Sequence, residues 1–433
     1  MKFIYTIAIA LIFSLTSAYK AEAHKSDTLR YAPASEAGLD GEYLSSTIDS
    51  LIQIATENYA FPGCQILVAR KGVIVHHKSY GHHTYRRYRP VENDHVFDLA
   101  SCSKVMGATI ALMKLVEDGK LNLDEPLSKV FPYFKDSNKE DITLREFLAH
   151  QGGLQPSVGV WNIIFDKNGK IREDLFSYTQ SEEYPVEVYR NMWGRKDLRE
   201  IVYKAVADTK LREKKYRYSC MSFLCYPYVV ESLTGKGYED FLREEFYIPL
   251  GADAIMLNPT HRYPREKILP TEVDETFRNA MVHGYVHDES AALLGGISGN
   301  AGVFANAESM ARIMQMLLNG GTYGGKRYLK KKTIQEWTSC QYPENDNRRG
   351  LGFDRPLLDE NYPCKSASLN SWGHTGFTGT MFWADPEEDL IFVFLTNRVY
   401  PDRGIDALGR LGTRGKCHEA VYEAIRLYES SKK

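Results

Sequence analysis

The sequence lacks an excess of charge of either sign. Its 433 residues include 54 Lys and Arg against 56 Asp and Glu, which gives a formal net charge of −2. That balance offers no electrostatic reason to expect nucleic acid or an anionic membrane surface as a partner. Repeats and low-complexity tracts are also missing, and 43% of the residues are hydrophobic. We therefore expect a globular chain, long enough to bury a sizeable core, with no nucleic-acid partner.

Paired cysteine motifs are lacking too. The seven cysteines show no CxxC spacing, so the sequence predicts no structural zinc site, and we expect neither a metal nor a cofactor. Because seven is an odd number, at least one cysteine is free or pairs between chains. The cysteines are Cys64, Cys102, Cys220, Cys225, Cys340, Cys364 and Cys417.

The N-terminus is the one segment that raises the question of a membrane. Lys2 precedes an apolar run over residues 3–15, and small residues follow at Ala21-Glu22-Ala23. This pattern is typical of a secretory signal and is short for a membrane span of about 20 residues. We predict a signal peptide over residues 1–23 and an exported protein, periplasmic if the source is Gram-negative. The alternative is a retained N-terminal anchor, and only then do we expect membrane association.

Strand patterns lie near both ends of the chain and helical patterns fill the middle. We predict strands at 65–69, 73–75, 379–383 and 390–395, and helices at 40–57, 103–117, 198–208, 221–234, 237–246, 307–318, 332–339 and 416–429. We expect an α+β fold in which residues 40–97 and 300–430 form an antiparallel sheet flanked by helices. Residues 98–299 then form a mostly helical lobe, with the active site at the boundary. The aperiodic segment 155–197 either walls a binding cleft or packs on the surface.

The first candidate for chemistry is Ser101-Cys102-Ser103-Lys104, which opens the apolar helix predicted at 103–117. Residues three apart share one helical face, so Ser101 and Lys104 lie one turn from each other. A serine hydroxyl becomes a good nucleophile only when a base takes its proton, and a partly desolvated lysine with a depressed pKa can be that base. Alone, the pattern is one that chance often produces, and it is then a helix-capping serine and a solvated lysine.

Two later motifs accompany this pair. They are Tyr218-Ser219-Cys220 and Trp372-Gly373-His374-Thr375-Gly376, which leads into a strand. Three such motifs in this order are typical of penicillin-binding proteins and β-lactamases. Over residues 40–430 the chain resembles the class C β-lactamase-related serine hydrolases, which include DD-peptidases and esterases. That resemblance implies a β-lactamase/transpeptidase-like fold. Further matches are Phe61-Pro62-Gly63, Phe97-Asp98-Leu99-Ala100, Thr143-Leu144-Arg145-Glu146, Gly153-Leu154, residues 231–235, residues 283–289, Leu294-Gly295-Gly296 and Thr396-Asn397-Arg398.

The resemblance also implies residue roles. It implies Ser101 as the acylated nucleophile, Lys104 as its activating partner and Tyr218 as a proton shuttle. The oxyanion hole is expected from the backbone N–H groups of Ser101 and Phe377, since preorganised donors stabilise the charge that develops in acyl transfer. The residues expected to bind substrate are Cys220, His374, Thr375 and Gly376.

Two departures from the family pattern bear on the substrate. Cys220 stands where Asn or Asp is usual, and a thiol forms weaker hydrogen bonds than an amide. His374 replaces the lysine of efficient class C β-lactamases, and a neutral imidazole holds a carboxylate less firmly than a fixed cation. We therefore predict an exported serine hydrolase acting on an amide or ester, such as a D-amino-acid peptide, a β-lactam or a small ester. The alternatives are a penicillin-binding or peptidoglycan-sensing module that acylates but hardly turns over, or an inactive scaffold.

Several residues keep a second interpretation. Cys220 is either a nucleophile or a small packed residue beside the site, and Tyr218 is a core tyrosine if the other motifs are disregarded. His283 and His287, four apart, form a metal pair if they lie on one helix, and a structural loop otherwise. The histidines in or after the first strand pair, namely His76, His77, His82 and His83, indicate a surface hairpin more than a metal site.

Overall fold

The computed structural model describes residues 27–433 of the chain. The predicted signal peptide at 1–23 lies outside the described residues. Within residues 27–433, no helix combines the length and the apolar character needed to cross a membrane.

A six-stranded sheet joins the two ends of the chain, as predicted. Its strand order is β1-β3-β2-β16-β15-β14. Antiparallel pairing of β2 with β16 places Cys64 opposite Thr396 and Arg70 opposite Leu390. The strands are β1 (Arg30–Tyr31), β2 (Gly63–Arg70), β3 (Val73–Gly81), β14 (Trp372–Thr375), β15 (Met381–Asp385) and β16 (Leu390–Thr396).

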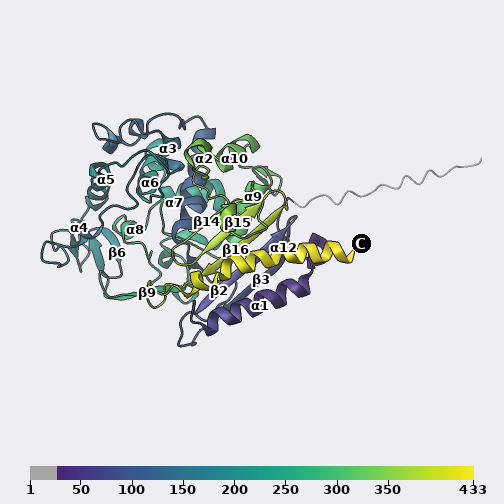
Figure 1. Ribbon diagram of the computed structural model, residues 1–433. Helices are drawn as coiled ribbons and strands as arrows, with labels where there is room; N and C mark the ends of the chain where they lie inside the picture. Colours follow the sequence, from purple (N-terminus) through teal and green to yellow (C-terminus); the bar gives the residue numbers. More distant parts are fainter. Residues whose placement is uncertain (1–26) are drawn as a thin grey trace, which may run out of the picture.

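Helices cover both faces of this sheet, which explains why β2 and β16 are continuous apolar runs. Side chains alternate between the faces of a strand. Ile66 and Val68 accordingly join a core cluster with α1 (Gly41–Glu57) and α12 (Thr413–Ser431), which lie side by side in Figure 1. Leu67 and Ala69 face the larger cluster, which includes α9 (Ala307–Leu318).

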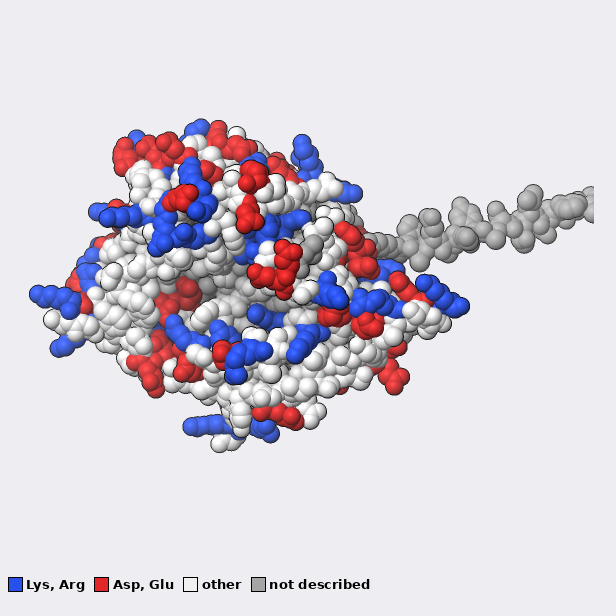
Figure 2. Space-filling view, in the orientation of Figure 1, with Lys and Arg blue, Asp and Glu red and all other residues white. Residues whose placement is uncertain are grey.

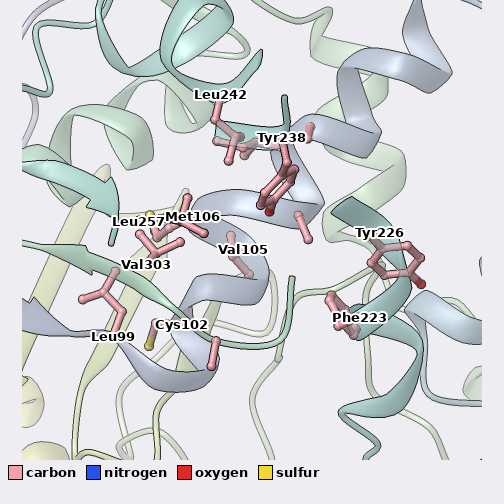
Figure 3. Packing of buried hydrophobic residues seen from close by; sticks show 14 of the residues in the cluster. Leu99, Cys102, Val105, Met106, Phe223, Tyr226, Tyr238, Leu242, Leu257 and Val303 are labelled. Atoms are coloured by element: carbon pink, nitrogen blue, oxygen red, sulfur yellow. The ribbon is translucent and has the colours of Figure 1, made fainter. Parts of the chain in front are cut away.

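The helix that follows the candidate nucleophile runs through the larger core. A short 3₁₀ turn at Ala100–Cys102 leads into a π-helical segment, Lys104–Thr109, and then α2 (Ile110–Glu117). Figure 3 shows Cys102, Val105 and Met106 packed among residues of other elements, such as Leu257 and Val303. The helix predicted at 103–117 is therefore present and buried, but its first part is π-helical, a form often found at functional sites.

Most other predicted helices are confirmed. The helix predicted at 237–246 is α7 (Tyr238–Leu242) continued by a π-helical segment, Arg243–Tyr247, and Pro227 lies inside α6 (Met221–Thr234). Thr143 and Glu146 form the predicted capping box at the start of α3 (Leu144–Leu148). The remaining helices are α3 (Leu144–Leu148), α4 (Trp161–Ile164), α5 (Leu198–Asp208), α6 (Met221–Thr234), α8 (Glu289–Leu293), α10 (Lys331–Thr338) and α11 (Ala407–Leu411).

Four small sheets complete the described fold. In one of them, β4 pairs with β11 directly before the nucleophile segment. Another lies within the segment 155–197, where β7 pairs with both β5 and β6. The strands are β4 (Phe97–Asp98), β5 (Phe176–Ser177), β6 (Val186–Tyr189), β7 (Met192–Gly194), β8 (Ile255–Leu257), β9 (Pro270–Asp274), β10 (Ala280–His283), β11 (Val303–Ala305), β12 (Thr322–Tyr323) and β13 (Lys326–Arg327).

Candidate active site

The backbone that presents Ser101 is strained and held on both sides. Ala100, directly before Ser101, has a φ of 45°, a left-handed conformation that is uncommon for alanine. The buried Asp98 carboxylate accepts hydrogen bonds from the Ala100 N–H at 2.8 Å and the His287 N–H at 2.7 Å. Strained residues persist where the surroundings over-determine them, and they concentrate at functional sites. The turn that aims Ser101 is thus fixed before any substrate binds.

Two side chains donate hydrogen bonds to the Ser101 hydroxyl. Lys104 Nζ lies 3.0 Å from Ser101 Oγ, and Tyr218 OH lies 2.9 Å from the same atom. Lys104 has no exposed surface, and its Nζ also donates to the backbone oxygen of Asn300 at 3.0 Å. These distances are those expected of a nucleophile and its proton acceptors. The three residues predicted as catalytic therefore meet in one place.

The charge state of Lys104 differs from the sequence-based expectation. Burial by itself lowers the pKa of this lysine, but its electrostatic interactions with Cys220 and Tyr218 more than reverse that effect and raise its pKa above the ordinary value. Burial raises the pKa of the Tyr218 hydroxyl, while the positive charge of Lys104 opposes the rise. The prediction of a depressed lysine pKa is therefore wrong, because the electrostatic interactions of Lys104 with Cys220 and Tyr218 favour its ammonium form. Proton acceptance belongs to the Lys104–Tyr218 pair as a unit.

Cys220 contacts the catalytic lysine. Its Sγ lies 3.4 Å from Lys104 Nζ, and its backbone N–H donates to the carbonyl of Pro156. Cys220 directly precedes α6 and is half-buried. The thiol occupies the position where the family pattern has an amide or carboxyl group, but it offers the lysine a weaker acceptor.

The other wall of the site is the end of β14 and the turn to β15. The Thr378 hydroxyl donates to the carbonyl of Asp98 at 2.8 Å, and the Thr380 hydroxyl donates to the carbonyl of Leu99 at 2.9 Å. Gly376 donates its N–H to the carbonyl of Thr380, which closes the turn. These bonds tie the turn containing Phe377 to the two residues before Ala100 and thereby set the spacing between the two predicted oxyanion donors.

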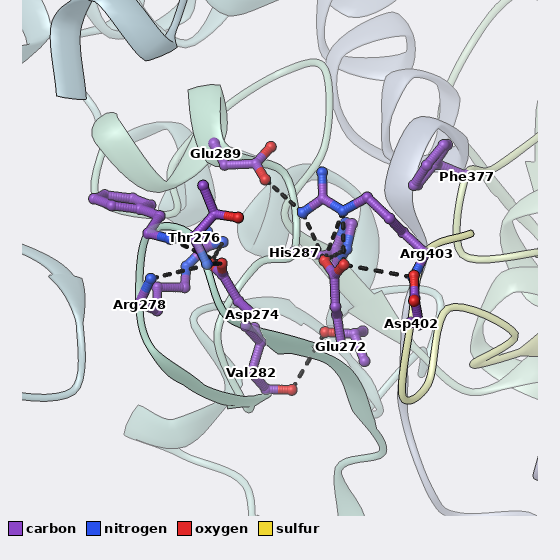
Figure 4. Close-up of polar contacts among 12 residues, drawn as sticks. Glu272, Asp274, Thr276, Arg278, Val282, His287, Glu289, Phe377, Asp402 and Arg403 are labelled. Carbon is purple, nitrogen blue, oxygen red and sulfur yellow. Dashed lines mark hydrogen bonds and ion pairs between the residues drawn. The ribbon is translucent and has the colours of Figure 1, made fainter. Parts of the chain in front are cut away.

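A polar network lies beside Phe377 (Figure 4). The His287 ring stacks on the Phe377 ring with 5.7 Å between centroids, and His287 Nε2 lies 2.8 Å from Glu272 Oε2. Glu272 also pairs with Arg403, which bonds Glu289 at 2.6 Å. Burial opposes ionisation of Glu272, but its bonds to His287 and Arg403 lower its pKa to about 2. The network supports the outer side of the turn.

His374 uses both ring nitrogens within the protein. Its Nδ1 lies 2.7 Å from the carbonyl of Thr375, and Arg349 donates toward its Nε2 at 3.4 Å. Burial first, and then the positive charges of Arg349 and Lys104, lower the pKa of His374 to about 3. The imidazole is therefore neutral, and the nearest guanidinium belongs to Arg349, a residue that the sequence analysis missed.

A cavity of about 510 Å³ opens over Ser101. Three arginines contribute to its lining, and Figure 2 shows the face of the molecule hollowed near its centre, with both basic and acidic side chains around the hollow. Thr375 and Gly376 line the cavity as predicted, whereas Cys220 does not. The lining residues are Ser101, Tyr218, Arg349, His374, Thr375, Gly376, Phe377, Gly379, Arg398, Asp406, Leu408, Gly409 and Arg414.

Two of these arginines, Arg398 and Arg414, are half-buried, and the carboxylate of Asp406, which lines the same cavity, interacts electrostatically with Arg398. Within residues 27–433, neither Arg398 nor Arg414 forms an ion pair. Arg398 donates to the carbonyls of Phe377, Arg403 and Ile405, and Arg414 only to two backbone carbonyls at 3.4 Å. Burial lowers the pKa of both groups. Arg398 was visible in the sequence beside Thr396 and Asn397, but no spacing rule pointed to Arg414.

The structure also decides how to interpret His283 and His287, the cysteines and the segment 155–197. His283 belongs to β10 and bonds backbone carbonyls, while His287 bonds Glu272, so the two do not share a helical face. The seven cysteines are all free. No residue of 157–197 lines the cavity, because this segment folds into its own small sheet. Only Gln155 and Pro156 reach the site, where their carbonyls accept from Ser219 and Cys220.

Comparisons with known proteins find a similar sequence and a similar fold. A relative from Salmonella gallinarum, provisionally named a D-alanyl-D-alanine carboxypeptidase, is 29% identical and covers 98% of this chain and 100% of its own. The structure of EstCE1, a hydrolase with promiscuous acyltransferase activity, has a TM-score of 0.63 at 19% identity and covers 88% of this chain and 99% of its own.

A second solved structure has the same fold. The D-amino acid amidase of Ochrobactrum anthropi has a TM-score of 0.61 at 18% identity and covers 88% of this chain and 99% of its own. The model of the family described as Beta-lactamase matches residues 48–413. Since that match takes in most of the chain, including Ser101, Lys104, Tyr218 and the His374-Thr375-Gly376 motif, the protein belongs to the beta-lactamase family and is a serine hydrolase acting on amides or esters.

Proposed function

We propose that this chain is an exported serine peptidase that cleaves D-amino-acid peptides with a free C-terminal carboxylate through an acyl-enzyme on Ser101. The observation that carries the proposal is the pair of hydrogen bonds that Ser101 Oγ receives from Lys104 and Tyr218, at 3.0 and 2.9 Å, inside a cavity lined by arginines. The name of the Salmonella relative supports the same substrate class.

The chemistry proceeds in two half reactions. In the form of the enzyme whose Lys104–Tyr218 pair has lost one proton, Ser101 Oγ attacks the scissile carbonyl, and its proton passes to that pair as the new C–O bond forms. The carbonyl oxygen becomes an anion against the N–H groups of Ser101 and Phe377. The pair then returns the proton to the leaving amine as the C–N bond breaks. Water attacks the resulting ester, gives a proton to the same pair, and Ser101 recovers its proton on release of the acid.

Arg398 and Arg414 support the choice of an anionic substrate. Both line the cavity, and neither forms an ion pair within residues 27–433. Both guanidinium groups are half-buried, so a carboxylate bound in the cavity could reach and pair with them. Charge-assisted bonds from guanidinium groups to carboxylates are also among the strongest that side chains make. The leaving amino acid, with its free α-carboxylate, is the group of the substrate that fits here.

The test uses a matched pair of substrates. Purified mature protein is incubated with diacetyl-L-Lys-D-Ala-D-Ala and with its C-terminal amide, and released D-alanine or D-alanine amide is measured. We expect kcat/KM to be at least tenfold higher for the free carboxylate, because the amide leaves the arginines unpaired. We expect Ser101→Ala to lose about 10³-fold or more of the turnover. Equal rates for the two substrates contradict the carboxylate assignment, and wild-type turnover in Ser101→Ala contradicts the nucleophile.

Export forms part of the same proposal and rests on the N-terminal pattern. Expression of the full chain in a Gram-negative host, followed by fractionation and N-terminal sequencing, should yield a periplasmic protein that begins at His24. A protein that keeps Met1 and sediments with membranes supports the anchor instead.

Cys220 favours a second candidate function, a penicillin-binding sensor. Its thiol is a weak acceptor 3.4 Å from Lys104, in the place where the family pattern has an amide or carboxyl group. A poorly oriented lysine slows the attack of water on the acyl-enzyme. Intact mass spectrometry after brief exposure to a penicillin separates the two functions. A Ser101 adduct that decays within minutes indicates a hydrolase, and one that persists for hours indicates a sensor.

A further inference from the structure

Arg349 is a charged residue of the cavity that lies outside the sequence motifs. Its side chain is only 7% exposed and is held from two sides. Nε donates to the hydroxyl of Tyr216 at 3.2 Å and lies 3.3 Å from the carboxylate of Asp354. Asp354 in turn exchanges two backbone hydrogen bonds with Gly373, which precedes His374 on β14. The guanidinium is thus fixed to the wall of the site by both a side chain and the strand.

From this position Arg349 contacts two of the candidate site residues. Its guanidinium carbon lies 5.2 Å from the centre of the Tyr218 ring, and one of its nitrogens donates toward His374 Nε2 at 3.4 Å. Cations within about 6 Å of an aromatic ring are attracted to its face. Arg349 therefore restrains the ring whose hydroxyl bonds Ser101.

We propose that Arg349 is a positioning residue for Tyr218: it fixes the tyrosine ring beside Ser101 and supplies the permanent positive charge that His374 does not provide. The inference rests on the proposed acyl transfer at Ser101. It accounts for how a site with a neutral histidine in its His-Thr-Gly motif keeps a second cation next to the proton shuttle.

The charges around Tyr218 support this role. The groups that face it are Lys104, Cys220, His150, His374 and Arg349. Burial lowers the pKa of His150 well below its usual range and that of His374 to about 3, so both are neutral. Lys104 and Arg349 are thus the two cations of this group.

The counter-ion does not cancel the charge of Arg349. Asp354 pairs with two arginines, with Arg348 at 2.8 Å and with Arg349 at 3.3 Å, so the three side chains together carry one net positive charge. Burial disfavours the charged form of Arg349, but Asp354 keeps its pKa above the ordinary value. Arg348 is the more exposed of the two, at 25%, and contacts the Tyr362 ring. This difference makes Arg348 a matched control.

The experiment measures hydrolysis of p-nitrophenyl acetate, a neutral ester, against pH in wild type, Arg349→Met, Arg349→Lys and Arg348→Met. The rate requires the Lys104–Tyr218 pair to lose one proton, so kcat/KM rises with pH. The acid limb is the pH range over which kcat/KM rises. In Arg349→Met we expect this limb to move up by on the order of one pH unit, and kcat/KM below it to fall about tenfold. Arg349→Lys should recover most of the loss, mainly in kcat. Arg348→Met removes the same charge from a more exposed side chain that contacts Tyr362, so it should move the profile by less than half as much.

Asp354→Asn keeps the inference testable if Arg349→Met does not fold. This nearly isosteric change removes the negative charge from the cluster, so the acid limb should move down in pH rather than up. An unmoved limb in folded Arg349→Met or Asp354→Asn overturns the role. So does a loss in Arg349→Met that appears only with carboxylate substrates, since that result would make Arg349 a substrate ligand.

Failure of the underlying function has a different signature. A wild-type enzyme that neither hydrolyses the ester nor forms a penicillin adduct at Ser101 contradicts the proposed acyl transfer itself, and the role of Arg349 falls with it. An active wild type whose Arg349 variants keep its pH profile contradicts the role of Arg349 alone.

Discussion

Gly376 offers a direct test of whether the turn after β14 sets the geometry of catalysis. A Cβ added there would lie 2.1 Å from Thr380 Oγ1 and 2.5 Å from the carbonyl oxygen of Leu99. The second contact is with backbone, so a rotamer change cannot relieve it. For an ordinary contact the turn must move by on the order of 1 Å away from the strand that leads to Ser101.

That displacement acts on the oxyanion hole. Phe377, whose N–H is the proposed second donor, directly follows Gly376, while Ser101 lies on the other side of the gap. A misplacement of 1 Å at a reacting centre costs about 10²-fold in rate. We therefore expect Gly376→Ala to lower kcat/KM by about 10²-fold, mostly through kcat, and to shift Tm by only a few degrees, since the turn lies at the edge of the sheet.

Gly409 is the matched control, because it lines the same cavity and a Cβ there meets nothing within 4 Å. It lies in α11, where alanine is the better helix former by up to about 1 kcal/mol. Ester hydrolysis, Ser101 acylation by a fluorophosphonate and thermal melting are measured on both variants. A folded Gly376→Ala protein with wild-type kcat/KM refutes the argument, and so does an equal loss in Gly409→Ala.

Three further predictions concern other parts of the molecule. Cys220→Asn replaces the weak thiol acceptor of Lys104 by an amide oxygen, and we expect about a tenfold faster decay of the penicillin adduct, followed by intact mass. Arg278→Met leaves the carboxylate of Asp274 without its buried ion-pair partner, so urea unfolding should show a loss of about 3–5 kcal/mol. His374 has a pKa of about 3, so it gains a proton only below about pH 3, and His374→Gln should keep any inflection of kcat/KM between pH 5 and 9.

Each of these predictions has a clear contrary result. A penicillin adduct that is longer-lived in Cys220→Asn than in wild type contradicts the role assigned to the thiol. Unfolding of Arg278→Met within 1 kcal/mol of wild type means that the pair is not needed for stability. If wild type shows an inflection of kcat/KM near neutral pH and His374→Gln does not, the His374 imidazole titrates in that range. This result contradicts the conclusion that His374 stays neutral.

The sequence by itself determined the order of the elements and the chemical centre. Apolar runs and helical periods predicted most helices and the sheet built from both ends of the chain. A strand or helix that buries one face repeats its apolar residues with the period of that element. Ser101, Lys104 and Tyr218 were found because the first two lie one helical turn apart and all three belong to recognisable motifs.

Only the tertiary structure determined which charged groups surround the active site. Arg349, Arg398 and Arg414 come to one cavity from separate segments, and no local spacing reports such a meeting. The raised pKa of Lys104 likewise depends on groups that lie more than a hundred residues away in the chain. Charge interacts through space rather than along the sequence, so the motifs identified the nucleophile, while the fold determined which charges surround it.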